Sequence, residues 1–386
     1  MVEAEQAATD SGNGTGVRAL FGVARSHLIY WQRKPSAWLV VVPVFLYVFA
    51  SSLSVSPLSQ FIIVRVCRAL GPELGSIPTG AEEKYMHFLA DPEYSQCVVR
   101  ADVQAAAALL SQLLGIAFDT PALLLVPVMG SLVDTRGRRS MLACPVLAAL
   151  LFALAIAAVH QFELTLWTLV PARLFCGCLG GFPLLTLAAN AFVADTTPPD
   201  RRTHAFLLID TTVFVGFSLG PLCGGLLYRT AGILPVVALV VVSCLSVLLY
   251  LAFVLPETVS SASLLLHSRS QPISTSSPIR YIGITFVRSW TKAFDVLATP
   301  EHASSLVVLA ITAACNNIGS AGYQFAFYFY PSQRFAWDAY DFGLYSMAKS
   351  FCRMFYLSVL MPFLLRTFVT GRERIQKTRA EITIIR

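Results

Sequence analysis

The sequence contains little charge. Only 13% of its 386 residues are Asp, Glu, Lys or Arg, whereas 56% are hydrophobic. A soluble domain is charged at roughly a quarter of its residues, because its surface must face water. So few charges exclude an ordinary water-covered surface. We therefore expect an all-α membrane protein whose outer surface lies largely in the lipid bilayer.

The sequence also lacks the motifs of common chemistry. It has no nucleophile–base pair, phosphate-binding loop or zinc-ligand spacing, so we expect no enzyme, no metal site and no cofactor. The net charge of +6 is not gathered on a basic helix or on a strand that mixes aromatic and basic residues. Nucleic acid is therefore not an expected partner. A signal peptide is not expected either, because the first apolar run begins late and is too long.

Long apolar runs are what the sequence does have. A membrane-spanning helix needs about 20 largely apolar residues. Eight segments reach that length: 37–57, 103–130, 141–159, 164–191, 204–228, 233–255, 303–325 and 341–364. We expect five parts: a disordered tail (1–36), a six-helix N-terminal bundle (37–255), a Ser-rich linker (256–302), a partial C-terminal bundle of two helices (303–364) and a basic tail (365–386).

Lys and Arg are unevenly distributed among the connecting segments. Most of the 28 fall in the two tails, in 130–140, in 192–203 and in the linker. Positive loops stay in the cytosol, so both termini are expected there, with the chain in the plasma or vacuolar membrane. Cys67 and Cys97 then bracket an outer loop. If this loop faces an oxidising space they can form a disulfide; two free thiols are the alternative.

One connecting loop carries the strongest local motif. It reads Gly130-Ser131-Leu132-Val133-Asp134-Thr135-Arg136-Gly137-Arg138-Arg139. A carboxylate faces a set of guanidinium donors here, and such a cluster can form ionic hydrogen bonds in one conformation and release them in another. We therefore expect Asp134, Arg136, Arg138 and Arg139 to act as a gate. A simple positive anchor on the cytosolic side is the alternative.

This run resembles the loop signature Gly-x-x-x-Asp-x-x-Gly-Arg-Arg of the major facilitator superfamily. A second signature is Arg173-Leu174-Phe175-Cys176-Gly177 with Gly180, and a third is Gly216 followed by Gly220-Pro221-Leu222-Cys223-Gly224-Gly225. Within the superfamily the chain is most similar to the proton-coupled folate transporter family. That similarity includes Val193-Ala194-Asp195, Pro256-Glu257-Thr258, Trp337-Asp338 and Gly343. It implies a major-facilitator-like helical bundle and proton-driven uptake.

The resemblance is incomplete. The family's carboxylate in the fifth span falls on Asp210, but its acidic position in the fourth falls on Gly181 and its histidine in the seventh near Gly319. Folate is therefore not carried over as the substrate. A complete member has twelve spans, two six-helix halves around a cavity. We expect a chain truncated after its eighth span, either a fragment or completed by another chain.

Ionisable residues inside the predicted spans are candidate coupling groups, because charge in the membrane is costly. Asp119 and Asp210 are the candidate proton acceptors, and Arg173 is expected to tune one of them. A static, buried Asp–Arg pair is the alternative. Lys349 and Arg353 are four residues apart and share a helix face, so they repel each other unless an anion lies between them. An anionic substrate, a carboxylate of another helix, or extension of both side chains to the membrane surface would relieve this repulsion.

The predicted substrate site comprises Arg173, Asn316, Asn317, Lys349 and Arg353. These residues predict a proton-coupled secondary transporter of a small anionic organic solute, working by alternating access. Its expected partners are the solute, protons and lipid. A drug–proton antiporter is one alternative, favoured by the Gly-Pro-Gly-Gly pattern of the fifth span. A transport-inactive truncated protein that binds a full-length relative is the other.

Overall fold

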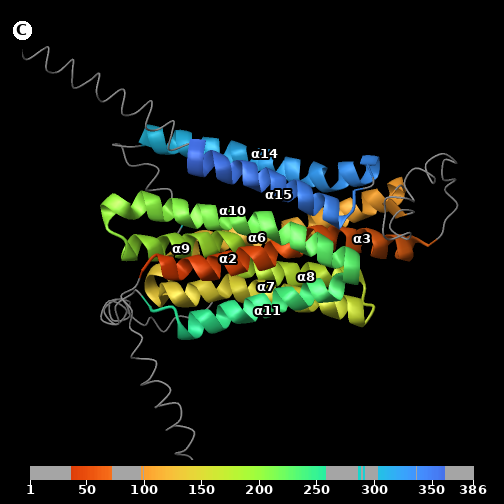
Figure 1. The fold of residues 1–386 in the computed structure, drawn as a ribbon, viewed down its shortest axis with the longest axis horizontal. Helices are drawn as coiled ribbons and strands as arrows, with labels where there is room; N and C mark the ends of the chain where they lie inside the picture. Colours follow the sequence, from red (N-terminus) through yellow and green to blue (C-terminus); the bar gives the residue numbers. More distant parts are fainter. Residues whose placement is uncertain are drawn as a thin grey trace, which may run out of the picture.

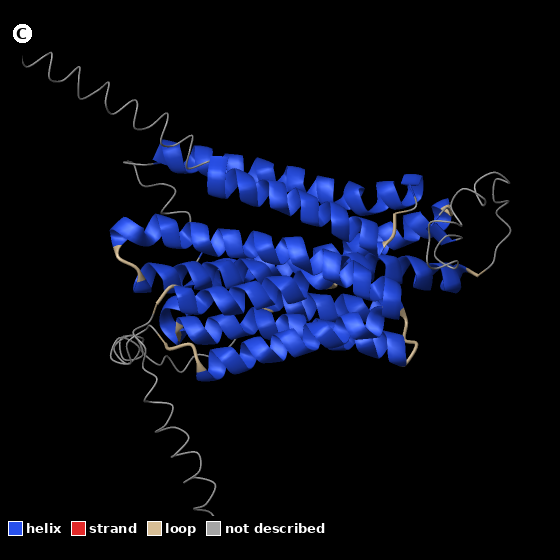
Figure 2. Ribbon diagram, in the orientation of Figure 1, coloured by secondary structure: helices blue, strands red, loops and turns tan. Residues whose placement is uncertain are grey.

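The computed structural model describes residues 36–71, 97–98, 100–257, 286–287, 290–291, 303–335 and 337–360. Within these ranges every regular element is a helix and no strand occurs, which confirms the all-helical prediction. The helices lie side by side along one common axis (Figures 1 and 2). Each satisfies its backbone hydrogen bonds internally, as a segment surrounded by lipid must.

The described chain contains these elements: α2 (Trp38–Leu53), α3 (Val55–Leu70), α6 (Ala101–Arg136), α7 (Arg138–Gln161), η1 (Leu166–Thr168), α8 (Leu169–Cys178), α9 (Gly181–Thr196), α10 (Pro199–Ala231), α11 (Ile233–Phe253), α14 (Ala303–Phe335), α15 (Ala339–Phe355) and the π-helical turn η2 (Tyr356–Leu360). Six helical stretches are long and apolar enough to cross a membrane: Trp38–Leu70, Ala101–Gly130, Arg138–Gln161, Leu166–Thr196, His204–Ala231 and Ile233–Phe253.

The helix boundaries differ from the predicted spans in three places. The first predicted span, 37–57, continues as α3 to Leu70, because the more polar residues after Ser54 still form a helix. The fourth span is interrupted between α8 and α9, where Gly180 (φ 81°) and Gly181 (φ 46°) adopt left-handed backbone angles. The predicted spans 303–325 and 341–364 correspond to α14 and α15, which are not among the six; 361–364 lies outside the described residues.

Helices α2 to α11 form one group, with α14 and α15 along one side (Figure 1). Helix α2 lies inside this group and packs mainly on α10 and α11. The most extensive contact between two helices joins α10 to α15. Helix α10 therefore connects the central helix of the group to the helix pair beside it.

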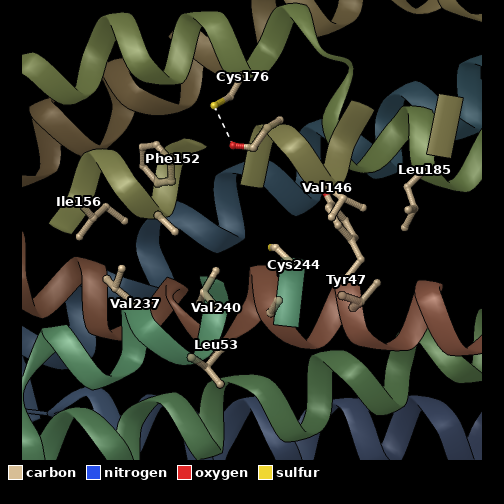
Figure 3. Packing of buried hydrophobic residues seen from close by; sticks show 14 of the residues in the cluster. Tyr47, Leu53, Val146, Phe152, Ile156, Cys176, Leu185, Val237, Val240 and Cys244 are labelled. Carbon is tan, nitrogen blue, oxygen red and sulfur yellow. Dashed lines mark hydrogen bonds between the residues drawn. The ribbon is translucent and has the colours of Figure 1, made fainter. Parts of the chain in front are cut away.

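Apolar side chains fill the space between α2, α7, α8 and α11 (Figure 3). Tyr47 of α2 is 4% exposed, and Cys244 of α11 and Val146 of α7 are fully buried. The thiol of Cys176 donates to the carbonyl oxygen of Ala148 at 3.1 Å, as the dashed line in Figure 3 shows. The buried cysteines thus pack as small apolar side chains.

Cys67 near the end of α3 forms a disulfide with Cys97, with an S–S distance of 2.09 Å. The sequence left this pairing open. The bond ties the end of the first span to the residues just before α6. It lies at the end of the bundle opposite Gly137, where the charge distribution predicts the extracellular side.

Glycines bring α2 and α10 together at van der Waals distance. A Cβ atom at Gly216 would lie 2.9 Å from Cγ1 of Val48, and one at Gly224 would lie 2.9 Å from the carbonyl carbon of Leu53. Between them, Ser52 donates to the carbonyl oxygen of Gly216 at 3.1 Å. Only residues without a side chain allow backbones to approach so closely.

Gly224→Ala tests this contact. The added methyl group meets the backbone of Leu53, which cannot rotate away, so we expect a loss of stability of about 1–3 kcal/mol. Thermal unfolding of the detergent-purified protein measures it. Gly319→Ala is the matched control, because no atom lies within 4 Å of a Cβ placed there. Equal melting temperatures for the two variants would contradict the packing described.

Candidate functional site

A charged cluster connects the ends of three helices at the predicted cytosolic side. We call it the Arg138 cluster; it comprises Arg138, Arg139, Asp195 and Glu257. Nε of Arg138 lies 3.0 Å from Oδ2 of Asp195, with the two side chains 12% and 36% exposed. The carboxylate of Glu257 accepts from the backbone N–H of Arg138 at 2.8 Å and of Arg139 at 3.2 Å. The cluster therefore joins the start of α7 to the end of α9 and to the residues after α11.

The turn before α7 explains why glycine occupies position 137. Gly137 has φ 95°, a backbone angle that disfavours any side chain, and a Cβ there would lie 2.7 Å from the carboxyl carbon of Glu257. With no Cβ in the way, that carboxylate sits at the N-terminus of α7, where unpaired amides and the helix dipole favour negative charge. Arg139 also donates from Nη2 to the carbonyl oxygen of Ala252 at 2.5 Å.

The structure brings two of the four predicted gate residues, Arg138 and Arg139, into this cluster. The side chains of the other two, Asp134 and Arg136, are not among those described. Asp195 and Glu257 were not predicted as site residues. The signal that could have found them was present, because both belong to the short runs Val193-Ala194-Asp195 and Pro256-Glu257-Thr258 that the sequence analysis singled out.

A second polar centre lies inside the six-span group around Arg173 of α8. Its guanidinium carbon lies 4.7 Å from the ring centre of Phe118 and 4.4 Å from that of Phe152. It interacts electrostatically with Asp119 and Tyr47. Two aromatic rings thus lie in cation–π contact with the guanidinium, which offsets part of the cost of burying a charge.

Close packing places Arg173 in this position. A Cβ at Gly177, one turn along α8, would lie 2.6 Å from Cγ of Pro121 in α6. Glycine therefore allows α8 to press against the turn of α6 that carries Phe118 and Asp119. Asp119 and Arg173 interact electrostatically, but among the described residues no ion pair within 4 Å joins them.

The third polar centre lies between α10, α14 and α15. Nζ of Lys349 lies 5.1 Å from the ring centre of Tyr323 and 5.5 Å from that of Phe327. Tyr323 and Tyr345 share a hydrogen bond between their hydroxyl groups, with the oxygens 3.0 Å apart. Both tyrosines and Lys349 are exposed. An aromatic wall thus lies beside the ammonium group.

Arg353, one turn further along α15, faces α10. Its guanidinium carbon lies 4.5 Å from the ring centre of Phe214 in α10. Arg353 also interacts electrostatically with Asp210, which lies one turn before Phe214 on α10. Among the described residues, no carboxylate lies within 4 Å of Lys349 or Arg353. We call Asp210, Lys349 and Arg353 the α15 cation site.

The remaining predicted residues of the substrate site lie on α14. Asn316 is exposed, and the side chain of Asn317 is not described. No hydrogen bond or ion pair between described residues connects the α15 cation site to the Arg173 centre. The site residues predicted from the sequence therefore form two separate groups in this structure.

The ion pair of the Arg138 cluster yields a prediction on stability. Arg138→Gln and Asp195→Asn should each lower stability, and the double variant should lose less than the sum, with a coupling of about 0.5–1 kcal/mol for so exposed a carboxylate. Unfolding of the four proteins in detergent measures this cycle. Arg201→Gln, exposed at the same end, is the control that should add independently to Asp195→Asn. Additive losses for the Arg138 and Asp195 variants would refute the ion pair.

Comparison with known proteins places these features in a family. Residues 86–377 match the family described as Major Facilitator Superfamily. The tetracycline resistance protein, class C, of Escherichia coli is 30% identical over 178 residues, which are 45% of this chain and 42% of that protein. The probable peptidoglycan muropeptide transporter SLC46 of Drosophila melanogaster is 25% identical over 222 residues, 56% of this chain and 41% of that protein. The matches thus span less than half of each relative.

One solved structure shares the fold. The crystal structure of the human organic anion transporter MFSD10 superposes with a TM-score of 0.58 at 21% identity. The superposition covers 84% of this chain and 71% of that chain. At this identity the likeness concerns the arrangement of helices alone.

Proposed function

Because the chain belongs to the major facilitator superfamily, we propose that it is a secondary transporter that carries a small anionic organic solute by alternating access, coupled to protons. The proposal rests on one observation. Lys349 and Arg353 occupy successive turns of α15, aromatic rings lie beside both, and Arg353 interacts electrostatically with Asp210 of α10. Charge inside a membrane protein is retained where a substrate or an ion needs it.

The charge balance of the α15 cation site favours an anion. With Asp210 ionised, the two cations leave a net charge of +1, which a monoanion neutralises. The aromatic walls at Tyr323 and Phe214 supply little counter-charge, since a ring offers only its quadrupole. An anion bound between the two side chains removes the repulsion between them.

The net charge of the α15 cation site also explains how solute binding would be coupled to protons. When Asp210 takes up a proton the net charge of the site rises to +2, so the site attracts an anion more strongly. By thermodynamic reciprocity, a bound anion then favours the protonated form of Asp210. Proton and solute bind together and move in the same direction, which is symport.

The Arg173 centre has a supporting role in this proposal. Phe118 and Phe152 stabilise the charge of Arg173 by cation–π contact, and its guanidinium N–H groups would donate to a carboxylate of the solute. Asp119 beside it is the second candidate proton carrier. Asn316 and Asn317 of α14 are the candidate hydrogen-bonding groups for the solute. The Arg138 cluster, with Asp134 and Arg136, gates the cytosolic end.

A drug–proton antiporter is the second candidate. The glycine and proline pattern from Gly216 to Gly225 favours it, as do relatives named as tetracycline and multidrug resistance proteins. In that case a cationic drug would compete with the proton for Asp119 or Asp210. An imposed proton gradient across sealed vesicles separates the two. It drives p-aminohippurate inward with protons in a symporter, and it drives tetracycline against the proton flow in an antiporter.

Asp210→Asn tests the coupling. The amide cannot take up a proton, so uptake of radiolabelled p-aminohippurate into vesicles should lose its acceleration at acidic pH. Asp119→Asn is the matched comparison and should keep the pH dependence, because Asp119 is not in the α15 cation site. Full pH dependence in the Asp210 variant, or its loss in the Asp119 variant alone, would reject the role proposed for Asp210.

Lys349→Gln and Arg353→Gln test anion binding. Each removes a charged donor, and such hydrogen bonds contribute roughly 1.5–3 kcal/mol, so we expect KM for the anion to rise about tenfold or more. Lys349→Arg, which keeps the positive charge, is the control and should retain most of the affinity. An unchanged KM in both Gln variants would place the anion elsewhere.

A further inference from the structure

Helices α10 and α15 meet backbone to backbone at the end opposite the Arg138 cluster. Gly225 and Gly343 make this possible from the two sides. A Cβ at Gly225 would lie 2.7 Å from the Cα of Tyr340, and one at Gly343 would lie 2.8 Å from the Cα of Leu222. In Figure 1 the start of α15 approaches the end of α10 and α3 in this region. Contacts this close are lost completely when the helices separate, so the interface is either closed or open.

The first turn of α15 carries its own cap. Asp338 accepts from the backbone N–H of Tyr340 and of Asp341, both at 2.9 Å. Asp341 accepts in return from the N–H of Asp338 at 3.2 Å, which completes a capping box. All these bonds lie within one segment. They therefore survive any movement of α15 as a rigid body.

Two further polar contacts cross from this turn to other helices. Oε1 of Gln60 in α3 accepts from the N–H of Ala339 at 2.9 Å, and Gln60 is 6% exposed. Nε of Arg229 in the last turn of α10 lies 3.8 Å from Oδ2 of Asp338, and its guanidinium lies 5.6 Å from the ring centre of Tyr340. A side chain from a distant helix thus satisfies an N–H that the cap leaves free.

We propose that Gln60, Arg229 and Asp338 form a gate that closes the extracellular end of the transport path; we call them the Asp338 gate. The proposal rests on alternating access as the proposed mode of function, and on the orientation that the loop charges predict. Opening breaks one buried hydrogen bond, one ion pair and the glycine contacts. Arg229 is already 38% exposed at the bundle end, and Asp338, which is 8% exposed, keeps the two N–H donors of its cap when the ion pair breaks.

Helix α3, which carries Gln60, is held within the six-span group. Phe61 and Ile63 of α3 belong to the buried core. The disulfide between Cys67 and Cys97 ties the end of α3 to the residues just before α6. Gln60 is therefore a fixed acceptor, so opening moves α15 and withdraws the N–H of Ala339 from it.

Thiol labelling tests the gate without a known substrate. Ser346 of α15 is 8% exposed, because it faces α10 just beyond the glycine contact. In Ser346→Cys, a membrane-impermeant maleimide added to intact cells should react slowly while the gate is closed. Peptide mass mapping reports this site separately from the native cysteines. Thr165→Cys, exposed in the loop between α7 and η1, is the control for reagent access.

Variants of the gate should speed this labelling. In the Ser346→Cys background, Gln60→Met leaves the N–H of Ala339 without its acceptor, so we expect about a tenfold faster reaction. Arg229→Gln and Asp338→Asn remove the ion pair and should give about a threefold increase each. Asp341→Asn alters the cap and weakens only an electrostatic interaction with Arg229, so it should change labelling less than any of these variants. The melting temperature of each variant confirms that it is folded.

Unchanged labelling in folded Gln60→Met, Arg229→Gln and Asp338→Asn would overturn the gate. Such a result would leave the proposed transport function intact, because that function is measured separately by anion uptake and its pH dependence. An equal rise at Thr165→Cys would also overturn the gate, since it would reflect general loosening of the bundle. Faster labelling at Ser346→Cys alone supports it.

Discussion

The close approach that glycine permits along α10 determines where the other functional groups lie. On one side, Gly216 and Gly224 bring α2 into contact with the α10 backbone, and on another Gly225 does the same for α15. Helix α10 is thereby fixed between the centre of the six-span group and the neighbouring helix pair. Asp210 and Phe214 are on this helix, so its position decides which side chains of α15 they meet.

The helices themselves could be predicted from the sequence, because about 20 consecutive apolar residues have one stable form in lipid. The ends of the spans were less predictable. Residues 54–70 mix Ser, Gln and Arg with apolar residues, which lowers their hydropathy although they continue the first span to Leu70. The break before α9 had a signal in Gly180 and Gly181. Single glycines in a span usually serve packing, so the signal was ambiguous.

The candidate site was only partly predictable. Lys349 and Arg353 share a face by simple helical spacing, and this could be read directly from the sequence. Spacing along the chain did not show that Asp195 and Glu257 meet Arg138. The three residues lie far apart in the sequence, at the end of α9, after α11 and at the start of α7. Nor did it show that Phe118 and Phe152 would cover Arg173, which separates that arginine from the more open cations of α15.

The two ends of the bundle are held by contacts of different kinds, and this difference bears on how the protein would move. The Arg138 cluster joins α7, α9 and the end of α11, which all belong to the six-span group. The cluster therefore stabilises that group, and any gating that it performs requires those three helices to move.

The Asp338 gate instead joins α15 to α3 and α10 and spans the boundary between the group and the helix pair. A rotation of α14 and α15 relative to the group would stretch the second set of contacts first and leave the first set unchanged. Asp210 and Arg353 interact electrostatically across that same boundary, so the proposed binding of a solute there would bias the rotation directly.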